Sequence, residues 1–193
     1  MRVIAGLAGG IHLTAPRRGV RPTMDRVKAA IFSSLGEQII GANVLDLFAG
    51  TGALGIEALS RGAGAVLFVE EGRQAVAAIE KNLATTKLQG RVRQQEAFQF
   101  LKNAGGREKF DLIFADPPYE KTKSGETFTD LLVNNEGLAR LLCPDGTFVL
   151  EKTPEEILTA TRFWEIVRRK AYGATEVLFL QHSNPVEGVA PQE

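Results

Sequence analysis

Short apolar runs alternate with segments of helical periodicity along most of the chain. Five of these runs have the composition of β-strands, at residues 43–48 (NVLDLF), 65–70 (AVLFVE), 91–95 (RVRQQ), 110–115 (FDLIFA) and 147–152 (TFVLEK). Between most of them, apolar residues recur at helical spacing, near residues 53–61, 73–85 and 127–142. This alternation is typical of parallel strands joined by crossover helices, so we expect an α/β, Rossmann-like fold with a mostly parallel sheet.

The two ends of the chain depart from this alternation. At the C-terminal end, the runs 164–170 and 176–182 are joined by only five residues, too few for a crossover helix. They predict an antiparallel pair at one edge, which brings the sheet to seven strands. At the N-terminal end, RVIAG and IHLTA flank LAGG and predict a short β-hairpin. A helix is expected to follow, with Thr23 as N-cap and Asp25 in its first turn.

The length of 193 residues fits one domain. We expect a single domain over residues 1–183, of which 1–36 form an N-terminal extension, and a flexible tail over 184–193. No stretch is long and apolar enough to span a bilayer, and no apolar run near the start has the length of a secretory signal, so a cytoplasmic protein is expected. The chain has one cysteine and two distant histidines, so neither a disulfide nor a metal site is expected.

The charge is unevenly distributed, although the formal net charge of the whole chain is zero. Residues 1–36 contain six basic side chains and one acidic side chain, a local net charge of +5. A basic N-terminal segment is a candidate surface for a polyanion such as RNA. The alternative is an ordinary solvated face.

A glycine motif follows the first predicted strand of the sheet. In DLFAGTGALGIEAL, Gly50, Gly52 and Gly55 have the spacing of a nucleotide-binding turn, where small residues let the backbone turn sharply and approach a ligand. Glu70 ends the next strand, where a carboxylate can accept hydrogen bonds from both ribose hydroxyls. The motif alone does not distinguish a dinucleotide from S-adenosylmethionine.

Asp46 favours S-adenosylmethionine among these cofactors. It precedes the glycines, where a carboxylate suits the amino acid end of S-adenosylmethionine and would repel a pyrophosphate. The alternative is that Asp46 only braces the loop or caps the helix. A dinucleotide-dependent oxidoreductase would also need residues for proton transfer, and the chain has no well-placed histidine.

The sequence Asp116-Pro117-Pro118-Tyr119 follows the fourth predicted strand. The carboxyl end of that strand should face the glycine turn, since parallel strands end at the same edge. The prolines fix the backbone and remove two N–H donors, which leaves carbonyl oxygens and the Asp116 carboxylate as a rigid row of acceptors. Such a row can hold the exocyclic amine of a nucleobase and direct its lone pair at a methyl donor, while Tyr119 offers a stacking surface. The alternative is a strand-ending turn.

In order and spacing, the segments RPTMDRVKAAIF, VLDLFAGTGALGIEALSRGA, FVE, FDLIFADPPY and YGATEVLF resemble the RsmD family of small-subunit ribosomal RNA guanine-N2 methyltransferases. The resemblance covers nearly the whole chain. It implies a class I methyltransferase fold, S-adenosylmethionine as donor without a metal, and the 2-amino group of a guanine in 16S ribosomal RNA, free or in an assembling particle, as acceptor. The motifs would place these residues at the cofactor: Asp46, Ala49, Gly50, Thr51, Gly52, Glu70, Glu96, Ala97, Arg21 and Thr23.

The family also implies an RNA-binding surface and a catalytic set. The catalytic residues would be Asp116, Pro117, Pro118 and Tyr119. Many members have Arg or Lys in the hairpin turn, whereas LAGG in this chain has no charge. The phosphate contacts are then expected from Arg17, Arg18, Arg21, Lys121 and Lys123. Three alternatives remain: an amino-methyltransferase for another RNA or for DNA adenine, a dinucleotide-dependent oxidoreductase, and a module that binds RNA without catalysis.

Overall fold

The computed structural model describes residues 1–15, 22–104, 108–122, 125–158 and 161–183. The predicted tail over 184–193 therefore lies outside the described residues, as do Arg17, Arg18, Arg21 and Lys123 among the expected site residues. Within the described ranges, no helix combines the length and the apolar character needed to cross a bilayer.

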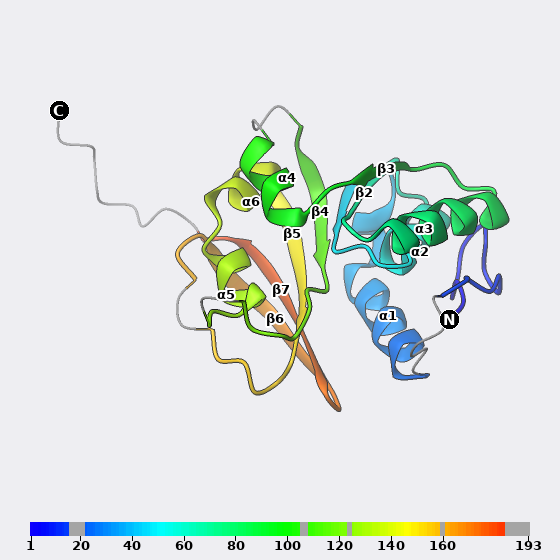
Figure 1. The fold of residues 1–193 in the computed structure, drawn as a ribbon. Coiled ribbons are helices and arrows are strands. Elements are labelled where there is room, and N and C mark those ends of the chain that lie inside the picture. The colour runs from blue at the N-terminus through cyan, green and yellow to red at the C-terminus, as the bar shows by residue number, and fades with distance from the viewer. Residues whose placement is uncertain (16–21, 105–107, 123–124, 159–160, 184–193) are drawn as a thin grey trace.

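Within the described ranges, seven strands form one sheet, as the sequence predicts (Figure 1). Their order across the sheet is β3-β2-β1-β4-β5-β7-β6. The first five strands along the chain are parallel, and β7 pairs antiparallel with both β5 and β6. The expected antiparallel pair thus lies at one side of the sheet, with β6 as the edge strand and β7 inside. The bounds are β1 Asn43–Leu47, β2 Ala65–Glu70, β3 Arg91–Gln94, β4 Phe110–Ala115, β5 Leu142–Lys152, β6 Trp164–Tyr172 and β7 Thr175–His182.

In the part of the chain that the structure describes, six α-helices and one 3₁₀ helix accompany the sheet. Their bounds are α1 Pro22–Leu35, η1 Gly36–Ile39, α2 Ala53–Ser60, α3 Arg73–Thr86, α4 Ala97–Asn103, α5 Phe128–Val133 and α6 Glu136–Leu141.

Three expectations about the helices need correction. Thr23 is not an N-cap, because α1 begins at Pro22, in keeping with the preference of proline for a first helical turn. The helical pattern over 127–142 forms two short helices, since the side chains of Thr127 and Asn135 each accept a hydrogen bond from the backbone and start a helix of their own. Helix α4 was not expected.

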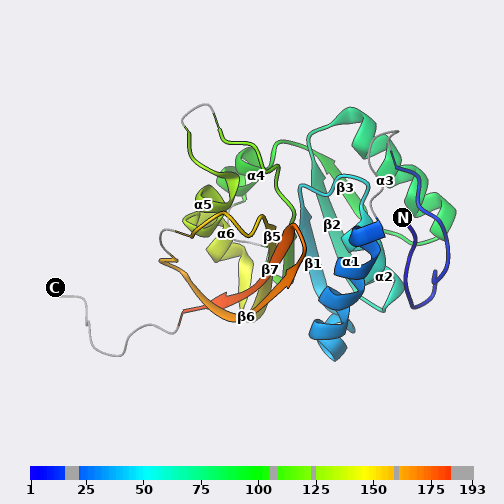
Figure 2. The same ribbon diagram turned by 90° about the horizontal axis from the view of Figure 1, so that it is seen from below.

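The sheet is covered on both faces, which explains the nearly uninterrupted apolar strands. Successive strand residues point to opposite faces. Val44, Phe114 and Val149 pack with α1, α2 and α3 on one face, and their neighbours along the strands pack with α4, α5 and α6 on the other. Figures 1 and 2 show the two groups of helices on opposite sides of the sheet.

The N-terminal segment forms the expected short antiparallel pairing and lies against α2. Val3 N–H donates to Ile11 O at 2.9 Å and Leu13 N–H to Met1 O at 3.0 Å, although only an isolated bridge joins the two arms. The Glu57 carboxylate accepts hydrogen bonds from the backbone of Ile4 and Ala5. The extension is therefore held on the core by a buried acidic side chain.

Candidate active site

A cavity of about 1390 Å³ lies at the carboxyl ends of β1, β2, β4 and β5. Pockets for a single small molecule are typically about 300–1,000 Å³, so this one has room for a cofactor and part of a second substrate. Most of the expected site residues line it, from the ends of β1, β2, β3 and β4: Asp46, Ala49, Gly50, Thr51, Glu70, Glu96, Ala97, Asp116, Pro117, Pro118 and Tyr119.

The glycine turn between β1 and α2 adopts a backbone that few residues tolerate. Gly50 and Gly52 have φ angles of 55° and 76°, in the left-handed region. Gly55 is required for packing, since a Cβ there would lie 2.3 Å from the Phe68 ring. Phe48 also has a positive φ, 56°, and borders the cavity. Strain of this kind is concentrated at functional sites.

The side chain of Glu70 holds the turn in place. Its Oε2 accepts a hydrogen bond from Gly50 N–H at 2.8 Å, and its Oε1 accepts one from Gly72 N–H at 2.8 Å. Each carboxylate oxygen has a second lone pair, so both can still accept a hydroxyl from a ligand in the cavity. Glu70 therefore connects the glycine turn to the position where a ribose is expected.

Asp46 braces the turn and also faces the cavity. Its Oδ2 accepts a hydrogen bond from Gly55 N–H at 2.9 Å, so the bracing role is present in the structure. Burial raises the pKa of Asp46 to about 8. The hydrogen bond from Gly55 lowers this pKa, and the charges of Asp116 and Glu70 raise it further. A cationic group in the cavity would relieve that cost.

Glu96 and Ala97 lie where β3 leads into α4. Both carboxylate oxygens of Glu96 cap α4, by accepting from Phe98 N–H at 2.9 Å and Gln99 N–H at 2.8 Å. The Phe98 ring packs with the rings of Phe48 and Phe128, with centroids about 6 Å apart. Phe48 and Phe128 line the cavity, which makes this side of it apolar and suited to a flat ring.

Asp116 to Tyr119 form the opposite side of the cavity. Burial raises the pKa of Asp116 to about 6. Tyr119 is 48% exposed, so its ring is accessible from solvent. Burial, the Asp116 charge and more distant carboxylates raise the pKa of Tyr119 to about 12, against a hydrogen bond with the Thr175 side chain. The tyrosine ring is thus held beside the acidic group and remains neutral at physiological pH.

Glu151, near the end of β5, is a site residue that sequence reasoning missed. It lines the cavity beside Asp116. Burial, followed by the charges of Asp116 and Asp46, raises the pKa of Glu151 well above its usual range. Its position at the carboxyl end of the predicted strand TFVLEK was the available signal, because all parallel strands end at the same edge.

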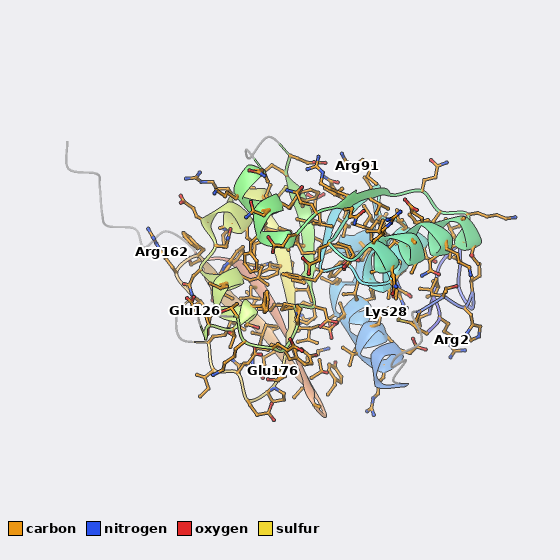
Figure 3. The ribbon with its side chains drawn as sticks, in the orientation of Figure 1. Arg2, Lys28, Arg91, Glu126, Arg162 and Glu176 are labelled. Carbon is orange, nitrogen blue, oxygen red and sulfur yellow. The ribbon has the colours of Figure 1, made fainter. Side chains whose placement is uncertain are left out.

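The charge of the cavity restricts its ligands. One basic side chain among the described residues, Lys28, lines it, and the Lys28 ammonium donates to Arg2 O at 2.6 Å and pairs with Glu57 at 3.1 Å. Figure 3 shows Lys28 on the side of α1 that faces the N-terminal segment with Arg2. The acidic side chains are Asp46, Glu70, Glu71, Glu96, Asp116, Glu151 and Glu155. Such a cavity favours cations and N–H donors and disfavours a pyrophosphate.

Three of the remaining expected residues lie in described segments, and four, Arg17, Arg18, Arg21 and Lys123, lie outside them. Gly52 forms the N-cap of α2 and does not line the cavity. Thr23 lies in the first turn of α1. Lys121 is exposed and forms an isolated bridge with Thr127.

Two features together define a class I methyltransferase. One is the strand order with an antiparallel β7, and the other is the cavity formed by the glycine turn and the acidic strand ends. A solved structure of a candidate methyltransferase, YhhF from Escherichia coli, matches with a TM-score of 0.79 and 35% identity over 94% of this chain and 97% of that one. The family model described as conserved hypothetical protein 95 matches residues 1–181.

Two named methyltransferases are similar to this chain over nearly its whole length. Ribosomal RNA small subunit methyltransferase D of Haemophilus influenzae is 34% identical over 94% of each chain. The candidate rRNA methyltransferase YlbH of Bacillus subtilis is 38% identical over 92% of this chain and 96% of its own. The chain therefore belongs to the conserved hypothetical protein 95 family, the RsmD family of methyltransferases.

Proposed function

We propose that this rRNA methyltransferase methylates the 2-amino group of a guanine in small-subunit (16S) ribosomal RNA, with S-adenosylmethionine as donor. The observation that carries the proposal is the acceptor row Asp116 to Tyr119 beside the glycine turn, in one acidic cavity. The named relative from Haemophilus influenzae supports ribosomal RNA of the small subunit as the substrate.

The residues present fit the cofactor. It carries a sulfonium and an ammonium group, and the buried carboxylates of Asp46 and Asp116 both have raised pKa values that a cation would lower. Glu70 has free lone pairs for the ribose, and Ala97 and Phe48 give an apolar wall for the adenine. When bound, the cofactor supplies a methyl group that a nucleophile can displace from sulfur.

Asp116 prepares the amine for this displacement. The lone pair of a guanine 2-amino group is delocalised into the ring, so the amine is a poor nucleophile. The Asp116 carboxylate and the Pro117 carbonyl accept hydrogen bonds from its two N–H groups and turn its lone pair toward the methyl carbon. Held by Asp46 and Glu70, the cofactor would supply its methyl carbon to this lone pair and would keep the electron pair of the carbon–sulfur bond on sulfur. Asp116, with a pKa of about 6, can take the proton that the nitrogen loses.

Basic residues of the N-terminal segment and of the segment after Tyr119 are proposed to bind phosphates. The acidic cavity itself repels phosphate groups, so the RNA backbone needs contacts elsewhere. Arg17, Arg18, Arg21 and Lys123 are candidates from the sequence, and the exposed side chain of Lys121 is a further one.

Two experiments test the proposal. Ribosomal RNA from cells that lack the gene should have one guanine without the N2 methyl group that it carries in parent cells. If every guanine that is N2-methylated in parent cells is still methylated, the proposed substrate is wrong. Melting temperatures measured with S-adenosylhomocysteine, NAD and NADP test the cofactor, because only a ligand of the folded state raises the melting temperature.

The Asp116→Ala variant tests the mechanism. Single-turnover methyl transfer to ribosomal RNA should fall on the order of 10²-fold or more, the typical effect of removing one preorganised group, while affinity for S-adenosylhomocysteine changes little. Asp145→Ala is a matched control, because Asp145 is exposed near the amino end of β5 and does not line the cavity. If Asp116→Ala methylates at the parental rate, residues 116–119 form only a strand-ending turn and the catalytic role of Asp116 is wrong.

A further inference from the structure

Glu151 is a cavity carboxylate without an assigned task. No hydrogen bond or ion pair to its side chain occurs within the ranges that the structure describes, whereas two other carboxylates of the cavity, Asp46 and Glu70, are bound by backbone N–H groups. Its side chain is half-buried, lines the cavity and is not needed to hold the glycine turn. An acceptor in that situation is available for a donor on a ligand.

The register of the sheet places Glu151 beside Asp116. Ala115 of β4 pairs with Leu150 of β5, so the next residues along the two parallel strands are Asp116 and Glu151. Residues that lie side by side on neighbouring strands point to the same face, and the strands are about 4.8 Å apart. The charge of Asp116 also raises the pKa of Glu151, which agrees with this proximity.

The same group of residues surrounds the acceptor side of the cavity. Glu151 pairs with Val177 of β7, and Thr175, two residues away on the same face, contacts the Tyr119 hydroxyl. Glu151 and Thr175 thus lie on the tyrosine side, whereas Glu70 and Glu96 lie on the side of β2 and β3. A base that stacks on Tyr119 would have its edge near both Asp116 and Glu151.

Guanine matches two adjacent carboxylates. Its N1–H and its 2-amino group are neighbouring donors on one edge of the ring, whereas adenine and 2-aminopurine have an unprotonated, electron-rich N1. A carboxylate accepts hydrogen bonds and cannot donate one when ionised, and hydrogen bonds from the guanine donors favour the ionised form of Glu151 against the burial that raises its pKa. We propose that Glu151 is a specificity-determining residue that accepts a hydrogen bond from guanine N1–H while Asp116 holds the 2-amino group. This inference rests on the proposed function and extends it.

The test compares two RNAs that differ at the target nucleotide. One carries guanine, and the other carries 2-aminopurine, which keeps the 2-amino group and lacks the N1–H. Single-turnover methyl transfer from labelled cofactor is measured for the parent, Glu151→Gln and Glu151→Ala. The parent should prefer guanine on the order of 10²-fold, since a buried acceptor left facing a ring lone pair is costly.

Glu151→Gln should reduce that preference about tenfold or more, because its amide can donate to the N1 of 2-aminopurine. Glu151→Ala should also reduce the preference for guanine, but it should not speed up methylation of the 2-aminopurine RNA, because alanine has no N–H donor for N1. Glu165→Gln is a matched control, because Glu165 is an exposed glutamate on β6. Thermal unfolding and calorimetry with S-adenosylhomocysteine show that each variant folds and binds the cofactor.

An unchanged guanine preference in both folded variants would overturn the inference, even if both rates fall. If a variant methylates neither RNA, the preference is measured as relative RNA affinity in the presence of S-adenosylhomocysteine, with the same two outcomes. If the parent itself does not methylate the guanine RNA, the proposed function is wrong, which distinguishes that failure from a failure of the role of Glu151.

Discussion

Glu57 of α2 is the side chain whose removal should affect the protein most outside the cavity. It is fully buried, and its carboxylate accepts hydrogen bonds from Ile4 N–H at 2.7 Å and Ala5 N–H at 3.1 Å. Lys28 of α1 lies 3.1 Å from one of its oxygens and Arg61 lies 2.7 Å from the other. One acidic group thus connects the N-terminal segment, α1 and α2.

The change Glu57→Gln keeps the size of the side chain and removes its charge. Lys28, 3% exposed, would then keep a buried charge without its ion-pair partner. Breaking a buried ion pair in this way typically costs about 3–5 kcal/mol of unfolding free energy, a large part of the 5–15 kcal/mol of an ordinary domain. For a chain of this size the melting temperature should fall by about 6–20 °C.

Urea and thermal unfolding measure this loss, with Glu80→Gln as control. Glu80 is exposed on α3, and its substitution should change the stability by less than about 0.5 kcal/mol. A double-mutant cycle with Lys28→Met identifies the cause, because removal of both charges should cost clearly less than the sum of the single changes. Strictly additive effects, or a loss below about 1 kcal/mol for Glu57→Gln, would refute the reasoning.

The remaining predictions concern the cavity and the basic segment. Glu70→Ala should weaken S-adenosylhomocysteine binding by about 1–3 kcal/mol in calorimetry, and an unchanged dissociation constant in a folded variant would exclude Glu70 from the cofactor site. Tyr119→Ala should weaken RNA binding by a similar amount through lost stacking, whereas Tyr119→Phe keeps the ring and should bind nearly as the parent does; equal losses would contradict a stacking role. Replacing Arg17 and Arg18 with Ala should flatten the salt dependence of RNA affinity by up to about two phosphate contacts in filter binding. Identical slopes for variant and parent would mean that these arginines belong to an ordinary solvated face. Because the pKa of Asp46 is about 8 in the folded chain and near 4 when unfolded, its proton stabilises the ligand-free protein fully below about pH 4, and this contribution is lost as the pH rises through 8. Between pH 5 and pH 9 the parent should therefore lose stability more steeply than Asp46→Asn, and parallel curves would contradict this.

The sequence by itself determined the features that depend on local pattern. Strand β4 coincides with the apolar run 110–115, and the glycine turn and Asp116 follow β1 and β4 as predicted. Apolar periodicity and the backbone demands of glycine and proline act over a few residues, so they can be read without the fold. Because the strands were predicted to be parallel, the carboxyl ends of β1 and β4 were expected at the same edge of the sheet.

Only the tertiary structure decided which charged groups are buried and which carboxylates meet. Glu57 lies in a short helix where a glutamate is normally exposed, and it is buried because the backbone of Ile4 and Ala5, more than fifty positions away in the chain, supplies its donors. The end of a predicted strand puts Glu151 at the same edge of the sheet as Asp116, but only the register of β4 and β5 makes the two residues neighbours. Burial and pairing of charges are set by distant segments brought together, and local patterns do not contain that information.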